Sequence, residues 1–185
     1  MNDELTQLQA DVQYLKDRFE IQDCIARHAR GHDRHDVELL TGTYHDDGVD
    51  EHGHTVNRGP DYAAWANQTH AMSSAAHLHN VTTQRCEIDG DIAHCESYVM
   101  VALLSPDEKT TSIMNGRYID RLERREGTWR IAVRRATVDV VVVGDASMLS
   151  HPSFRQQGYI QGARNDTDVS YQRPTTLDGT EPARW

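Results

Sequence analysis

Histidine is the residue type in this sequence that is best suited to chemistry at neutral pH. The 185 residues include eleven histidines, dispersed along the chain rather than gathered in a tag. An imidazole titrates near neutrality and also binds metal ions, so function depends on which of these rings come together in space. His77 and His79 are two positions apart, and on a strand both rings would point to one face. His52 and His54 repeat this spacing.

Metal binding is the first chemistry to weigh against these histidines. A cupin-type site would need a Glu a few positions after the His77–His79 pair and a further His on a later strand. Gln84 stands in place of that Glu, and residues 110–143 contain no His, so only a site built from scattered histidines would remain. We therefore expect no metal. We also expect no cofactor and no serine nucleophile, since the sequence has no Walker, Gly-x-Gly-x-x-Gly or Gly-x-Ser-x-Gly pattern.

Composition limits the partners and the compartment. Nineteen Lys and Arg against twenty-nine Asp and Glu give a net charge of −10, which argues against a nucleic-acid partner. The longest apolar stretch, residues 138–143, is far shorter than the roughly 20 residues that cross a bilayer, so we expect no membrane partner and no signal peptide. Three cysteines without a Cys-x-x-Cys pair favour a reduced, cytoplasmic setting, in which Cys86 and Cys95 would be core thiols.

Helical periodicity characterises the first seventy residues. Apolar side chains recur at spacings of three and four, in a stripe made of Leu5, Leu8, Val12, Leu15, Phe19, Ile21, Cys24, Ile25 and Ala29. We expect one long helix that ends at Gly31, then a short helix with Asp33 or Asp36 as its N-cap. A weak hairpin over residues 44–57 and a helix from about Pro60 to His70 would follow.

Strand patterns begin at His77. Turn signals such as Asp89-Gly90 separate four apolar segments, at residues 77–88, 92–104, 110–122 and 129–143. Helices followed by a meander of long strands predict an α+β fold, with N-terminal helices packed in a curved antiparallel sheet. Residues 145–185 carry three of the five prolines and few aliphatic side chains, so we predict one domain over residues 1–144 and an irregular C-terminal extension.

Three strings in this layout resemble one known family. They are EIQDCIARHARGHDRHD at residues 20–36, HNVTTQRCEIDGDIAHCES at 79–97 and NGRYIDRLERREGTWRIAVRR at 115–135. The sequence is similar to the SnoaL-like branch of the NTF2-like superfamily, which folds as a cone-shaped α+β barrel. This superfamily contains scytalone dehydratase, hexachlorocyclohexane dehydrochlorinase and bile acid 7α-dehydratase, as well as isomerases, cyclases and binders, so the fold alone does not give the function.

The resemblance implies particular site residues. In lyases of the family an Asp just after the first helix pairs with a His on the first long strand, and Asp33 and His79 match these positions. His28 matches a Tyr or Lys that precedes the Asp by five residues. Arg134 matches a positively charged position that lines the pocket in some members.

These four residues suit proton transfer. A histidine base needs a carboxylate on its second nitrogen to fix the tautomer and to stabilise the imidazolium, as His79 and Asp33 would provide. Arg134 would stabilise developing negative charge, and His28 would protonate or hold a leaving hydroxyl. The combination predicts a cofactor-independent lyase, most simply a dehydratase. A retro-aldol lyase that releases an aldehyde, an isomerase or a cyclase would use the same groups, and a non-catalytic small-molecule-binding domain is the alternative from another class.

Ordinary structural roles compete with these assignments. Asp33 could cap a helix, His79 could be a hydrogen-bonded buried ring, Arg134 could form a salt bridge and His28 could face solvent. We expect a small hydrophobic substrate of aromatic or polycyclic size in an apolar cavity within the cone. The residues expected to line it are Tyr44, Trp65, His77, Met100, Met114 and Tyr118. The resemblance also implies a homo-oligomer, with a trimer favoured over a dimer.

Overall fold

The first element of the chain is a long helix that extends further than the sequence indicates. The computed structural model describes residues 2–178 and 181–185, and α1 spans Asn2–Asp33. Gly31, the predicted end, lies inside the helix. A Cβ at this position would lie 2.8 Å from the Cβ of Leu40, so the glycine is needed for the close approach of the next helix.

The apolar stripe of α1 divides into two parts that face different ways. Ile21, Cys24 and Ile25 are almost completely buried, whereas Leu15 and Phe19 are 55% and 70% exposed. Phe19 and Ile21 lie about 200° apart around the helix axis, so the second part does not continue the first. The prediction that one apolar stripe continues from Leu5 to Ala29 was therefore wrong, although the predicted helix is confirmed.

Two short elements and a third helix follow α1. Helix α2 (Val37–Thr41) begins at Asp36, whose carboxylate accepts the N–H of Leu39 at 2.9 Å, so Asp36 is the N-cap. The predicted weak hairpin is β1 (Tyr44–His52) with β2 (Thr55–Arg58). Helix α3 (Gly59–Ser73) starts with a proline in its first turn, as the sequence suggests.

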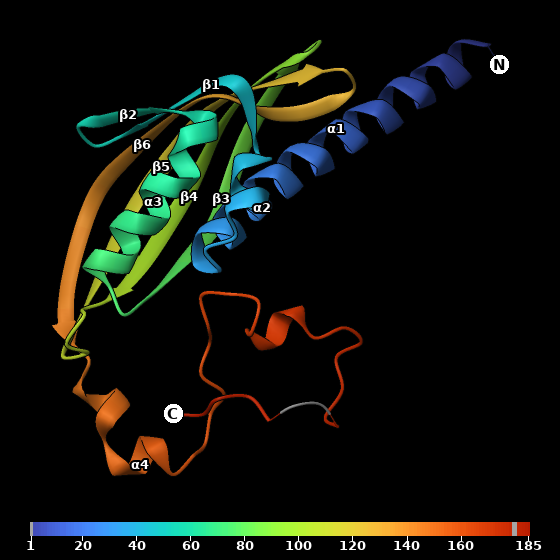
Figure 1. The fold of residues 1–185 in the computed structure, drawn as a ribbon. Coiled ribbons are helices and arrows are strands. Elements are labelled where there is room, and N and C mark those ends of the chain that lie inside the picture. Colours follow the sequence, from blue (N-terminus) through green and yellow to red (C-terminus); the bar gives the residue numbers. More distant parts are fainter. Residues whose placement is uncertain (1, 179–180) are drawn as a thin grey trace.

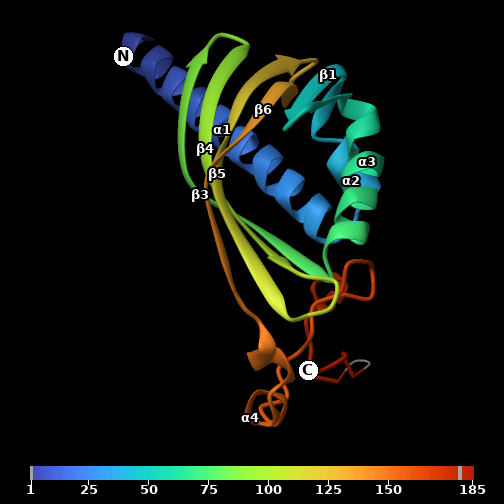
Figure 2. The ribbon, with the colours of Figure 1, turned by 90° about the vertical axis from the view of Figure 1, so that its left-hand side faces the viewer.

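Four long strands complete a six-stranded curved sheet. They are β3 (Ala76–Asp89), β4 (Ile92–Leu104), β5 (Thr110–Arg125) and β6 (Thr128–Asp145), and the strand order is β2-β1-β6-β5-β4-β3. All neighbours are antiparallel except β1 and β6, which run parallel. The sheet wraps around the C-terminal half of α1, with α3 beside it, while the N-terminal half of α1 projects beyond the sheet (Figures 1 and 2). The predicted α+β plan is confirmed.

The apolar core lies between α1, α3 and the concave face of the sheet. Its largest members are Ile21, Ile25, Leu40, Tyr44, Tyr62, Leu122, Trp129 and Ile131. Cys86 and Cys95 are opposite each other on β3 and β4, and both are free thiols. Trp129 also donates its indole N–H to Asp17 at 2.9 Å, which anchors the sheet to α1.

The C-terminal segment packs against one end of this assembly. After β6 it contains η1 (Ser147–Ser150), α4 (Pro152–Arg155) and η2 (Val169–Tyr171), with irregular chain between them. Asp168 lies 3.2 Å from Arg34 just after α1, and Arg164 donates to the Ser74 hydroxyl at 2.8 Å. No helix within residues 2–178 and 181–185 is long and apolar enough to span a bilayer.

Candidate active site

A carboxylate and an imidazole meet where α1 ends against the edge strand β3. The Oδ1 of Asp33 lies 2.8 Å from the Nδ1 of His79. The main-chain N–H of His79 also donates to both carboxylate oxygens, each at 3.1 Å. The carboxylate is therefore fixed by a main-chain and a side-chain donor. Because His79 donates its Nδ1–H to Asp33, the lone pair of the neutral ring lies on Nε2.

The Asp33–His79 pair is shielded but not sealed. The side chains of His79 and Asp33 are 3% and 11% exposed. Both residues border an open groove of about 330 Å³ between α1 and β3. Its lining residues are Ala26, Ala29, Arg30, Asp33, Arg34, His79 and Val81. A small molecule can therefore approach the pair from the protein surface.

Three further imidazoles surround His79 on its inner side. The ring centroid of His79 lies 4.7 Å from that of His32 and 5.5 Å from those of His70 and His77. Burial lowers the pKa of His32 well below its usual value, and lowers the pKa of His70 to about 2 and that of His77 to about 4. These three rings are therefore neutral at neutral pH, and they do not add positive charge beside His79.

A second hydrogen-bonded group lies deeper, around His28. Tyr44 donates its hydroxyl to Asp50 at 2.6 Å, and its oxygen lies 2.9 Å from the Nε2 of His28. The Tyr44 hydroxyl uses its proton on Asp50, so it accepts the Nε2–H of His28. Burial lowers the pKa of His28 well below its usual value, and burial raises the pKa of Tyr44 well above its own. Both groups are therefore neutral.

Arg134 forms a salt bridge inside the cone. Its Nε and Nη2 donate to the two carboxylate oxygens of Asp120, each at 2.7 Å, and both side chains are completely buried. The guanidinium also lies 4.1 Å from the ring centroid of Tyr118. Although burial opposes its charge, the Asp120 carboxylate holds the pKa of Arg134 well above its usual value. The remaining nitrogen, Nη1, is buried without a hydrogen-bond partner.

This arrangement coincides with a family match. A family model described as SnoaL-like domain matches residues 13–135, which are 123 of the 185 residues. The chain belongs to the SnoaL-like family. The sequence resemblance is thereby confirmed, and so is the cone-shaped α+β fold that it implied.

Solved structures extend the comparison of this SnoaL-like chain. Rv3472 from Mycobacterium tuberculosis, a protein of unknown function, is 30% identical over 70% of this chain and 75% of its own, with a TM-score of 0.62. A type 2 hexachlorocyclohexane dehydrochlorinase (LinA) is 21% identical over 72% and 93%, with a TM-score of 0.68. A putative scytalone dehydratase from Novosphingobium aromaticivorans is 16% identical over 72% and 90%, with a TM-score of 0.64. The last two likenesses show the shared fold. No curated protein matches the sequence significantly.

Most residues expected to line the site of this SnoaL-like chain lie inside the cone. Tyr44 and Tyr118 are buried, and Trp65 lies with its ring 5.7 Å from that of Tyr62. His77 is also buried, and its Nε2 lies 2.9 Å from the carbonyl oxygen of His32. Met114 on β5 lies opposite Val101 on β4, and Val101 lies opposite His79 on β3. Met114 therefore shares the inner face of the sheet with His79.

Met100 is the exception among the expected lining residues. Met100 lies opposite Asn80 on β3 and Asn115 on β5, and it is 36% exposed. The next residue of β4, Val101, is the one that lies opposite His79. Successive residues of a strand point to opposite faces, so Met100 lies on the outer face of the sheet. The expectation that it lines the pocket was wrong. The expected apolar cavity also differs from the structure, because imidazoles and hydroxyls surround His79.

Sequence reasoning missed two of the imidazoles and two supporting residues. His32 follows His28 by four residues, so both lie on one face of α1, and this spacing was a usable signal. His70 lies near the end of α3, and only the packing of α3 brings it to the site. Tyr62 contacts His32, with its hydroxyl 3.1 Å from the Nε2 atom, and Asp120 is the partner of Arg134.

The same imidazoles are the residues that could hold a metal ion. One ligand atom from each of His32, His70 and His79 lies within 4.8 Å of the others, and so do atoms of Asp33, His77 and His79. Zinc–nitrogen bonds of about 2.0–2.1 Å place the nitrogens of a tetrahedral site about 3.4 Å apart. In the second set the Oδ1 of Asp33 lies 2.8 Å from the Nδ1 of His79 and 3.9 Å from the Nε2 of His77. Both sets also contain His79, so a metal there would occupy the imidazole of the Asp33–His79 pair.

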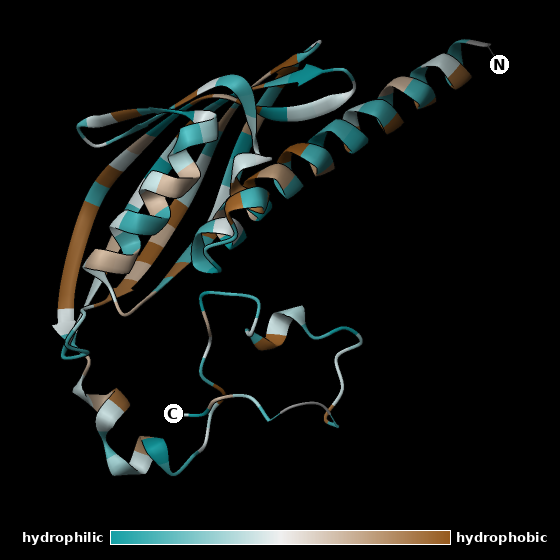
Figure 3. Ribbon diagram, viewed as in Figure 1, coloured by the Kyte–Doolittle hydropathy of each residue, from teal (hydrophilic) through white to brown (hydrophobic). Residues whose placement is uncertain are grey.

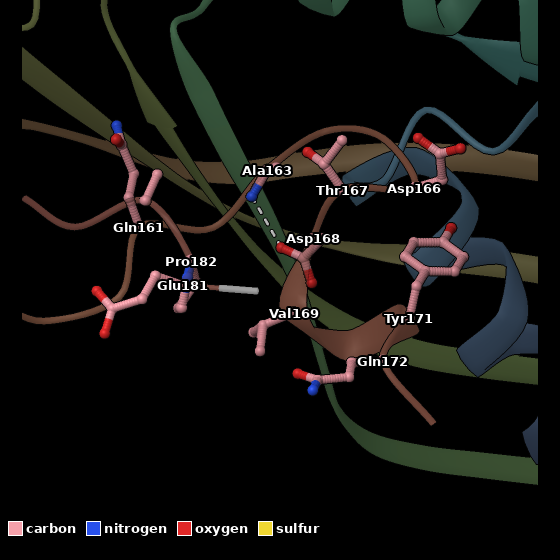
Figure 4. Close-up of a pocket in the computed structure, with 11 residues that line it drawn as sticks. Gln161, Ala163, Asp166, Thr167, Asp168, Val169, Tyr171, Gln172, Glu181 and Pro182 are labelled. Carbon is pink, nitrogen blue, oxygen red and sulfur yellow. Dashed lines mark hydrogen bonds between the residues drawn. The ribbon is translucent and has the colours of Figure 1, made fainter. Parts of the chain in front are cut away.

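A larger hollow in the structure lies away from these residues. It has a volume of about 550 Å³, and its lining comes from the C-terminal segment between Gln161 and Ala183 (Figure 4). The carboxylate of Asp168 in this hollow accepts the N–H of Ala163 at 2.8 Å and contacts Arg34. These contacts hold the segment in place, and the acidic residues Asp166 and Glu181 also line the hollow.

Proposed function

We propose that this chain is a cofactor-independent lyase in which His79 is the general base and Asp33 orients it. The observation that carries the proposal is the hydrogen bond from His79 Nδ1 to Asp33, which leaves the lone pair of Nε2 unused in a shielded place beside an open groove. A carboxylate in this position fixes the tautomer and stabilises the imidazolium that forms when the ring accepts a proton.

The reaction that we propose is a β-elimination of the dehydratase type. His79 Nε2 takes a proton from the carbon next to an electron-withdrawing group, and the electrons of that C–H bond form the new double bond. The bond from the neighbouring carbon to its hydroxyl breaks, and the hydroxyl leaves as water. The neutral rings of His28 and His32 are poor proton donors, because burial keeps their pKa low. The imidazolium of His79 therefore returns its proton to the leaving hydroxyl.

The surroundings of the pair support a small hydrophobic substrate with an aromatic or polycyclic ring. Aromatic side chains line the interior behind His79, with Tyr62 and Trp65 from α3 and Tyr118 from β5. Ala26, Ala29 and Val81 supply the apolar part of the groove itself, and burial of apolar surface against them favours an apolar ligand. The dehydrochlorinase and putative dehydratase that share the fold carry names of elimination enzymes, and this agrees with the proposed class.

Two substitutions and one matched control test the proposal. Aromatic β-hydroxy carbonyl compounds and diaryl diols would be screened for turnover by the wild type, and kcat/KM would then be compared among variants. We expect His79→Ala and Asp33→Asn each to lower kcat/KM by roughly 10²–10⁴-fold. His94→Ala removes an exposed histidine from the outer face of β4 and should leave the rate unchanged.

The folded state of each variant must be checked by circular dichroism and thermal unfolding. Asparagine keeps an oxygen that can accept the main-chain N–H of His79, so Asp33→Asn should remain folded. Wild-type rates in both folded variants would contradict the assigned base. A ligand that binds in the groove but is never converted would instead identify a small-molecule-binding domain.

A further inference from the structure

The N-terminal half of α1 carries its described side chains on the surface. Every described side chain from Asp3 to Lys16 is exposed, and this part of α1 projects beyond the sheet (Figure 1). A helical segment of about 15 residues is only marginally stable in water unless one of its faces is packed. The segment therefore needs a covering surface.

One face of this segment carries a regular apolar seam. Its members are Leu5, Leu8, Val12, Leu15 and Phe19, and they are between 48% and 70% exposed. The spacings are three, four, three and four, which is the a/d pattern of a heptad repeat. Apolar colour recurs along the projecting part of α1 in Figure 3. The seam extends over about 21 Å of helix at 1.5 Å per residue.

From Leu5 to Leu15 the seam lies clear of the sheet, so a second helix has room to approach it, whereas Phe19 also borders a groove beside the β5–β6 turn at Gly127 and Thr128. Asp17 is the first residue of α1 that is buried against the sheet, where it binds Trp129 and Arg124. Leu15 and Phe19 each lie two residues from Asp17, about 200° around the axis. Two copies joined along the seam would carry their sheets on opposite outer sides.

We propose that α1 pairs with α1 of a second copy of this chain as a parallel two-stranded coiled coil. The charges beside the seam fit this occupant. If Leu5 occupies heptad position a, Asp11 occupies position g and Lys16 the following position e. In a parallel dimer, Asp11 of one helix lies next to Lys16 of the other, so their opposite charges attract. Arg18 and Asp23 occupy the next such positions, but Arg18 donates to the carbonyl oxygen of Cys86 at 2.9 Å and Asp23 pairs with Arg27. Asp11 and Lys16 are therefore the pair that supports the parallel orientation.

The apolar residues of the seam also favour two strands. Leucine at the d positions Leu8 and Leu15, with a β-branched residue at the a position Val12, is the combination that favours parallel dimers. The SnoaL-like family match begins only at residue 13, so most of the seam precedes the matched region. The coiled coil would make this protein a dimer, the alternative to the trimer that was favoured from the sequence.

Light scattering on full-length protein during size-exclusion chromatography tests the pairing. The wild type should have the mass of two 21.0 kDa chains, and Leu8→Glu combined with Leu15→Glu should have the mass of one. Both leucines are more than half exposed, so these changes should leave the folded domain intact. Tyr14→Glu is the matched control, because Tyr14 is 50% exposed on the same segment but lies outside the seam.

Oxidative cross-linking tests the parallel orientation. Val12→Cys places a thiol at an a position, which faces its own copy in a parallel pair, so a disulfide-linked dimer should form. Tyr14→Cys should remain uncross-linked, and the native cysteines are buried. A monomeric wild type, an unchanged mass after the double leucine substitution, or equal disassembly by Tyr14→Glu would overturn the proposal. Equal cross-linking by both cysteine variants would also overturn it.

Discussion

Two carboxylates of the cone, Asp120 and Asp33, each bind a nitrogen-bearing side chain, and the two pairs differ in accessibility. Asp120 and Arg134 are fully buried and joined by two hydrogen bonds of 2.7 Å. Asp33 and His79 are joined by one side-chain hydrogen bond of 2.8 Å beside an open groove. Arginine stays charged at any physiological pH, whereas histidine can gain and lose a proton.

This difference separates a structural pair from one suited to chemistry. In the Asp120–Arg134 pair burial raises the pKa of the carboxyl group, the guanidinium stays charged, and it lies 4.1 Å from the ring centroid of Tyr118. In the Asp33–His79 pair the carboxylate binds only the Nδ1 of the imidazole, in a setting where neighbouring imidazoles are neutral. One cone can therefore hold both a buried ion pair and a pair suited to proton transfer. Only Asp33 and His79 border the groove through which a substrate could approach.

The largest effect is expected from breaking the Asp120–Arg134 pair. Asp120→Ala leaves a charged guanidinium buried without its partner, and we expect the free energy of unfolding to fall by about 3–5 kcal/mol. Urea unfolding followed by circular dichroism measures this change. Asp139→Ala is the matched control, because Asp139 also binds an arginine, Arg117, but lies at the surface. Exposed ion pairs contribute about 0.2–1 kcal/mol, and a similar loss in both variants would contradict the distinction.

A second effect concerns the neutral imidazoles beside the Asp33–His79 pair. Burial lowers the pKa of His77 from 6.5 to about 4, so the unfolded chain binds this proton at a higher pH than the folded chain. Stability is therefore fully present above pH 6.5 and falls as the pH decreases towards 4. One such proton contributes about 1.4 kcal/mol per pH unit.

The variant His77→Gln isolates this contribution. Glutamine can still donate to the carbonyl oxygen of His32, which His77 contacts at 2.9 Å, but it does not titrate. Urea unfolding at several pH values between 4 and 6.5 should show a shallower loss of stability in this variant, by up to about 1.4 kcal/mol per pH unit. Parallel curves for the variant and the wild type would show that His77 is protonated equally in both states.

The sequence predicted the elements better than it predicted which face each residue occupies. Periodicity and turn signals located the helices and strands, and the resemblance brought Asp33 and His79 together. The distance between their side chains depends on how the end of α1 packs against β3, and local sequence patterns do not predict this packing. His70 shows this limit, because it reaches the site only through the position of α3 against the sheet. The seam of α1 shows it too, since spacing gives a helix but not the surface that the helix faces.

The error at Met100 has a specific geometric cause. A hairpin with unbroken register around Asp89-Gly90 would place Ala102 opposite His79, and Met100 would then share the face of His79. The pairing instead shifts by one residue between Val81 and Gln84, so Val101 lies opposite His79. A β-bulge of this kind changes the face of every residue beyond it relative to the partner strand. Nothing in the hydrophobic pattern of β3 marks the extra residue.

The smallest expected change in the free energy of unfolding comes from replacing a methionine on the outer face of the sheet, and a methionine on the inner face serves as the comparison. Met100→Ala removes an exposed side chain from the outer face, and we expect the free energy of unfolding to change by less than about 0.5 kcal/mol. Met114→Ala removes a partly buried side chain from the face that carries both pairs, and should cost at least about 1 kcal/mol. Urea unfolding of the two variants distinguishes these values. If Met100→Ala is the more costly change, Met100 faces the interior and the shifted register is wrong.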